Sequence, residues 1–70
     1  MKFIEVCRTL GRRIQVNLHV MDDDMESEKS LGMHEVHDIM SGCWSDYHNY
    51  QVIVIKPVSH IRLQVIVVKE

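Results

Sequence analysis

Residues 13–20, Arg-Ile-Gln-Val-Asn-Leu-His-Val, alternate between polar and apolar side chains without a break. In an extended chain successive side chains point to opposite faces, so the four apolar side chains share one face and the four polar ones share the other. This alternation is typical of a β-strand with one face in a core and one face in water. The segment therefore predicts a strand in a sheet that is covered on one side.

Three further segments favour extended structure. Residues 2–8 are rich in branched and aromatic side chains and predict a strand that forms a hairpin with 13–20 through a turn at Gly11. Residues 50–56 are almost continuously apolar and predict a central strand. Residues 60–68 alternate, and predict a fourth strand.

Composition supports this dominance of strands. Valine and isoleucine together account for seventeen of the 70 residues, and the chain has no alanine. Branched side chains suit a half-buried pleated surface, whereas alanine is the best helix former. Pro57, which has no backbone N–H to donate, is expected to turn the chain between the last two strands.

One amphipathic helix is predicted at 30–42. Its apolar side chains recur at steps of three and four residues, the helical period. Ser27 or Ser30 can cap its start, and Gly42 is placed to end it. The apolar positions are Met33, Val36, Ile39, Met40 and Cys43.

The expected order of elements is thus β-β-α-β-β in a single domain, residues 1–70. The fold class is α+β: a four-stranded, mostly antiparallel sheet with one helix packed on it. Such a short chain buries only about 60% of its unfolded surface, so its core is marginal.

Charge is sorted along the chain. Residues 21–46 contain eight acidic residues and a single lysine, while the segments on either side are basic and the net charge is −2. The acids gather in the stretch 22–38, which also holds two histidines. A charge run is usually solvated, but a dense cluster on a small body also steers the encounter with a basic partner.

A metal site is a weak candidate within the same region. Four residues of ligand type lie close together in the chain, and two of the histidines are three residues apart, a spacing that places them on one helix face. The spacing matches no zinc signature, because "HEVHD" brings the second histidine one residue too early for H-E-x-x-H. The candidate ligands are His34, His37, Cys43 and His48.

The sequence gives little support for a catalytic function. Cys43 has histidines nearby, but it follows the expected end of a helix and lies among acids, which disfavours a thiolate. Cys7 on a strand is expected to be a small core residue. The three glycines form no phosphate-binding loop. We therefore expect no enzyme activity and no cofactor.

Nucleic-acid binding through arginines is the alternative function. Arginine side chains on a hairpin turn can contact phosphates, although the chain as a whole is acidic and its strands lack aromatic residues for base stacking. The alternative predicts a nucleic-acid-associated regulator that uses Arg8, Arg12 and Arg13, with Arg62 as a further member.

The leading hypothesis is a small, non-enzymatic protein that binds and inhibits or regulates a larger protein through an acidic face. Tryptophan and tyrosine, which often anchor interfaces, flank the acids. In size and charge the chain is similar to small acidic phage and mobile-element proteins, including anti-CRISPR and other anti-defence proteins. The expected partner-binding residues are Asp22, Asp23, Asp24, Glu26, Glu28, Trp44 and Tyr47.

Two expectations concern the surroundings of the chain. Residues 65–68 are apolar on both faces of their strand, so a neighbouring element or a second copy of the chain must cover the second face; we expect a homodimer or higher oligomer. The sequence shows no signal-peptide pattern and no apolar stretch long enough to span a membrane, and its two cysteines make no disulfide framework. These features favour a cytoplasmic protein with reduced thiols. A single disulfide between Cys7 and Cys43 stays open as an alternative.

Overall fold

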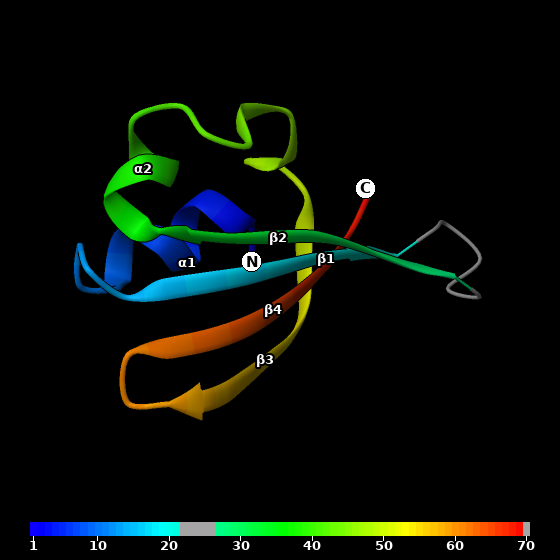
Figure 1. Ribbon diagram of the computed structural model, residues 1–70. Coiled ribbons are helices and arrows are strands. Elements are labelled where there is room, and N and C mark those ends of the chain that lie inside the picture. Colours follow the sequence, from blue (N-terminus) through cyan, green and yellow to red (C-terminus); the bar gives the residue numbers. More distant parts are fainter. Residues whose placement is uncertain (22–26, 70) are drawn as a thin grey trace.

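The computed structural model describes residues 1–21 and 27–69, and it has an α+β fold. Two helices, a 3-10 turn and four strands follow one another along the chain (Figure 1). The elements are α1 (Phe3–Thr9), β1 (Gln15–Met21), β2 (Glu28–Glu35), α2 (Val36–Met40), η1 (Ser45–Tyr47), β3 (Gln51–Ser59) and β4 (Arg62–Val68). The expected α+β class and the four-stranded sheet are confirmed.

The sheet is mixed rather than mostly antiparallel, and its strand order is β2-β1-β4-β3. Each edge strand pairs antiparallel with its neighbour in the chain, β2 with β1 and β3 with β4. The two resulting hairpins join through their inner strands, β1 and β4, which run parallel to each other. This parallel pair arises because the chain crosses over the sheet between β2 and β3, through α2 and the following turn.

The N-terminal segment is a helix and not the expected strand. Phe3, Val6 and Cys7 are buried on one side of α1, a spacing of three and four residues that matches a helix better than a strand. The backbone N–H of Lys2 donates to the Glu5 carboxylate at 2.8 Å, which caps the first turn. The predicted hairpin between 2–8 and 13–20 was therefore wrong. The order β-β-α-β-β is present after α1, but its first two strands are β1 and β2.

The predicted helix at 30–42 is only partly helical. Its first half forms β2, and only Val36–Met40 are helical. Backbone contacts decide this boundary: the N–H of Val36 donates to the carbonyl of Ile14 at 2.9 Å, so the chain leaves the sheet there. Gly32 has a φ of 88°, within the stretch of β2 where the pairing with β1 shifts register. Gly42, with a φ of 121°, follows the end of α2 as expected.

The third and fourth strands lie close to where the sequence placed them. The predictions 50–56 and 60–68 correspond to β3 and β4. Pro57 does not turn the chain but lies within β3, on an edge strand where a missing N–H is tolerated, and the turn falls at 60–61.

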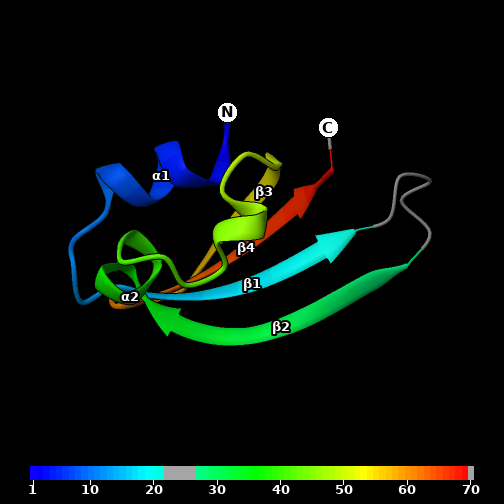
Figure 2. The ribbon, with the colours of Figure 1, turned by 90° about the horizontal axis from the view of Figure 1, so that it is seen from above.

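Both helices and η1 lie on one face of the sheet (Figure 2). The fully buried side chains come from α1, α2 and the covered face of the two inner strands; they are Phe3, Cys7, Val16, Leu18, Val36, Ile39, Val65 and Val67. In the described part of the chain, no helix has the length and apolar character needed to cross a membrane.

The opposite face of the sheet carries no helix in Figure 2. Strand alternation and the pairing registers place four sets of side chains in cross-strand rows on this uncovered face. The apolar side chains Val54, Ile66 and Val68 gather towards one end, in rows that also hold His19 and Glu28, and the other end is mostly polar. We use the term uncovered face for this surface below.

Candidate functional site

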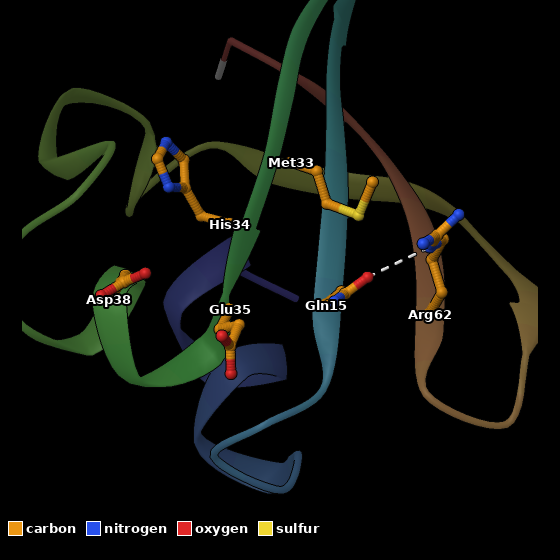
Figure 3. Close-up of a pocket in the computed structure, with 6 residues that line it drawn as sticks. All are labelled: Gln15, Met33, His34, Glu35, Asp38 and Arg62. Carbon is orange, nitrogen blue, oxygen red and sulfur yellow. Dashed lines mark hydrogen bonds between the residues drawn. The ribbon is translucent and has the colours of Figure 1, made fainter.

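A hollow of about 380 Å³ lies where β2 ends and α2 begins. Its walls come from four elements: β1, β2, α2 and the start of β4 (Figure 3). In that view His34 and Asp38 lie on one side of β2, whereas Gln15 and Met33 lie on the other. The lining residues are Gln15, Met33, His34, Glu35, Asp38 and Arg62. We call this space the acidic hollow, because its two carboxylates carry no lysine or arginine partner among the described residues.

One row of the uncovered face builds the floor of the acidic hollow. Gln15 pairs with Glu35 on one side and with Arg62 on the other, so the three residues cross three strands at one level. The Arg62 Nε donates to Gln15 Oε1 at 3.2 Å. Adjacent strands are about 4.8 Å apart, so the backbones at Glu35 and Arg62 are about 10 Å apart. Gln15 thus holds the guanidinium on the far side of the hollow from the carboxylate.

His37 bridges the two carboxylates of the hollow. Its Nε2 lies 3.4 Å from Glu35 Oε2 and its Nδ1 lies 3.4 Å from Asp38 Oδ1. All three side chains are substantially exposed, with 41%, 40% and 50% of their side-chain surface accessible. The site is therefore wet, and its charge is open to a partner arriving from solution.

His34 is turned towards the helix side of the sheet. Its ring lies edge-on to the Trp44 ring, with centroids 4.7 Å apart, and Trp44 in turn lies 6.3 Å from the ring of the buried Phe3. Trp44 has a φ of 59°, in the left-handed region that costs a non-glycine residue about 1–2 kcal/mol. Packing between Phe3 and His34 compensates for this conformation and holds the indole against His34, which lines the acidic hollow.

The four candidate metal ligands are not brought together. His34 faces Trp44, and His37 lies between two carboxylates. His48 Nε2 is 3.2 Å from the backbone carbonyl oxygen of Cys43, not from its thiol. Across residues 1–21 and 27–69, no group of three or more histidine, cysteine, aspartate or glutamate side chains is arranged to hold a metal ion.

The expected partner-binding residues are spread over different environments. Asp22, Asp23, Asp24 and Glu26 lie outside the described residues. Glu28, the first residue of β2, accepts a contact from His19 Nδ1 at 2.6 Å. The two aromatic residues are half-buried against the core, and the Tyr47 ring also meets that of Tyr50 edge-on at 5.1 Å. Trp44 and Tyr47 therefore serve the core as well as the surface.

Comparisons of this chain with protein-family models, with curated proteins and with solved structures found no match.

The arginines of the alternative hypothesis lie at one end of the molecule. Arg8 is in the last turn of α1, and Arg12 and Arg13 are in the turn that leads to β1. A second hollow of about 300 Å³ is lined by Arg12, Arg13 and His37. Arg62 does not join this group, because it lines the acidic hollow beside Gln15.

Both cysteines are free thiols, with Cys7 buried and Cys43 half-buried. Burial raises the pKa of the Cys7 thiol from 9.0 to about 11, so it is a neutral core side chain at physiological pH. A neutral, enclosed thiol is a poor nucleophile.

Sequence reasoning missed Gln15 and Met33 as members of the acidic hollow, and it placed Glu35 and Asp38 on one helix instead of on β2 and α2. The alternation in 13–20 already put Gln15 on the wet face. What the sequence lacked was the register, since only the pairing of Gln15 with both Glu35 and Arg62 shows that these three residues lie in one row across the sheet.

Proposed function

We propose that this chain is a non-enzymatic interaction protein that binds a basic segment of a larger protein and thereby inhibits or regulates it. The observation that carries the proposal is the acidic hollow, where Glu35 and Asp38 present partly exposed carboxylates that share only His37 as an ion-pair partner among the described residues. A lysine or arginine side chain of the partner would supply the missing positive charge.

The neighbouring side chains suit such a partner. Met33 is 39% exposed and lines the same hollow, where it offers apolar surface to the methylene groups of a long basic side chain. Arg62 is held by Gln15 at the opposite wall, where it can meet a carboxylate of the partner. Charges of both signs at fixed positions favour one orientation of the bound segment.

The acidic stretch of the sequence extends this charge beyond the hollow. Asp22, Asp23, Asp24 and Glu26 precede Glu28 in the chain, and β2 runs from Glu28 to Glu35. The negative electrostatic potential of these carboxylates accelerates the encounter with a basic partner more than it strengthens the final complex. The five acids are therefore assigned to the association rate, and Glu35 and Asp38 to the lifetime of the complex.

The chemistry of the described residues favours binding over catalysis. Cys7 is enclosed with a raised pKa, and His48 contacts the backbone of Cys43 and not its thiol. These arrangements give no activated nucleophile. The proposal therefore assigns no catalytic residue and no cofactor.

The test is an affinity capture from cell lysate with the tagged chain, followed by binding kinetics with the purified partner. The Glu35→Gln/Asp38→Asn variant is expected to raise the dissociation rate at least tenfold. Glu5→Gln is the matched control, because it removes a charge outside the hollow and keeps an acceptor for the Lys2 N–H. An identified, stoichiometric partner that the hollow variant binds as tightly as the wild type would refute the proposal.

A further inference from the structure

The second hollow, lined by Arg12, Arg13 and His37, takes no part in the proposed binding of a basic segment. It lies between the turn that follows α1 and the start of α2. Its volume, about 300 Å³, is at the lower end of the range of small-molecule sites, which run from about 300 to 1,000 Å³. The size suits one compact group rather than a large ligand.

Backbone hydrogen bonds fix the two walls of this hollow relative to each other. The N–H of His37 donates to the carbonyl of Arg12 at 3.0 Å, and the N–H of Val36 donates to that of Ile14 at 2.9 Å. The turn itself closes through the Ile14 N–H and the Gly11 carbonyl at 3.1 Å. The backbone positions from which the two arginines extend are therefore held in place before any ligand arrives.

The charge in the hollow is uncompensated on its arginine side. Arg12 and Arg13 are exposed, and within residues 1–21 and 27–69 neither forms an ion pair with a carboxylate. Two neighbouring guanidinium groups repel each other, and an anion placed between them would remove that repulsion. A guanidinium fork also matches the geometry of a phosphate, with two parallel N–H donors.

The acids beside His37 narrow the choice of anion. Both ring nitrogens of His37 face carboxylates at 3.4 Å, so the ring forms a wall and the two arginines are the donors. Glu35 and Asp38 lie just beyond that wall and would repel a long polyanion that passes over the site. A small ligand that ends in one phosphate meets this repulsion with a single phosphate, whereas a nucleic-acid strand brings further phosphates past the same carboxylates.

We propose that the hollow lined by Arg12, Arg13 and His37 is a binding site for a phosphate group, supplied either as the free ion or as the terminal phosphate of a small phosphomonoester. The two guanidinium groups bind its oxygens, and the His37 ring closes the site on the α2 side. The assignment does not depend on the proposed protein-binding function, because the two hollows have different donor groups.

The test follows backbone and arginine side-chain N–H signals by NMR while inorganic phosphate is added to the protein in a phosphate-free buffer. We expect saturable shifts at Arg12 and Arg13, and at least a tenfold increase in the phosphate Kd for the Arg12→Gln/Arg13→Gln variant. The matched control is Arg62→Gln, which removes an arginine from the other hollow and should leave phosphate binding unchanged. Arg12→Lys/Arg13→Lys keeps the charge and tests the fork geometry, with an intermediate loss expected.

Two further titrations identify the source of the phosphate. Adenosine monophosphate that binds more tightly than the free ion would assign the site to a phosphomonoester, and equal affinities would assign it to the ion. A single-stranded oligonucleotide that binds at least tenfold more tightly than both, and is lost in the double variant, would overturn the proposal in favour of a nucleic-acid backbone. Shifts that grow linearly, or that persist in the double variant, would overturn it altogether.

Discussion

The imidazole of His34 lies edge-on to the indole of Trp44, with ring centroids 4.7 Å apart and planes inclined at 77°. This contact joins the edge strand β2 to the segment that follows α2. It also fixes the orientation of the indole, whose backbone adopts a left-handed conformation. The orientation of His34, which lines the acidic hollow, therefore depends on this ring pair.

The first prediction concerns the energy of this pair. An edge-to-face aromatic contact contributes about 0.5–1.5 kcal/mol beyond the area it buries. A double-mutant cycle of His34→Ala and Trp44→Ala should therefore give a coupling energy of about 1 kcal/mol, measured by urea unfolding followed by circular dichroism. His48→Ala with Trp44→Ala is the control pair, since no ring contact joins them, and should be additive. Additivity for His34 and Trp44 as well would show that the contact contributes nothing.

The second prediction concerns alkaline pH. The pKa of the Cys7 thiol is raised to about 11 in the folded chain from an ordinary value of 9.0, because burial disfavours the thiolate. Between these values the unfolded chain loses the thiol proton and the folded chain keeps it. The stabilisation is therefore complete below pH 9 and is lost as the pH rises to 11, by about 3 kcal/mol for two pKa units.

Urea unfolding between pH 8 and 11 checks this loss against Cys7→Ala, which has no thiol to ionise. Other groups titrate in the same range, but they do so in both proteins, so the difference between the two curves isolates Cys7. That difference should shrink steadily above pH 9. Parallel curves would show that the thiol ionises as easily in the folded chain as in the unfolded one.

The third prediction tests the helix at the N-terminus. In α1 the buried side chains are Phe3, Val6 and Cys7, whereas a strand would place Phe3, Glu5 and Cys7 on one face. Phe3→Ala should cost about 3–5 kcal/mol, which is enough to unfold much of so small a chain. Val6→Asp should be equally severe, and Glu5→Ala should be mild. Thermal unfolding of the three variants distinguishes helix from strand, because a strand would tolerate a polar residue at position 6.

The N-terminal helix also shows which parts of the fold the sequence could predict. Alternation through 13–20, and through 60–64 at the start of the last segment, indicates a strand in each case, and both segments form strands. The segment 2–8 is too short for its period to be decided, and β propensity pointed the wrong way. Its capping contact, from the Lys2 N–H to Glu5, was visible as a glutamate placed three residues after the cap.

The prediction of a helix at 30–42 was wrong for a different reason. Its residues from Met33 to Met40 fit a helical period, but tertiary contacts outweigh that pattern. The carbonyls of Arg12 and Ile14 accept the first N–H groups of α2, and β1 pairs with everything before them. Neither contact is local, so the boundary between β2 and α2 cannot be predicted from residues 30–42 alone. The acidic hollow, which forms at this boundary, could not be predicted for the same reason.

The fourth prediction is self-association through the uncovered face, the expectation that followed from the doubly apolar end of the last strand. Val65 and Val67 lie in the core, whereas Ile66 and Val68 point to the uncovered face. Glu35 and Arg62 of the acidic hollow lie at the other end of this face. A two-fold contact confined to the end with Ile66 and Val68 would be self-complementary and would leave the acidic hollow open to a partner.

Light scattering at micromolar concentration should therefore give a mass above the 8.2 kDa of one chain. Val68→Lys places a charge in the apolar end of the uncovered face and should return the protein to a monomer. Ile55→Lys is the matched control: Ile55 is 44% exposed, but it pairs with Val65 and so lies on the helix side of the sheet, where the same charge should leave the oligomer intact. A wild-type protein that stays at 8.2 kDa throughout would mean that the uncovered face is simply solvated, with its polar rows in water and Ile66 shielded by its neighbours on the sheet.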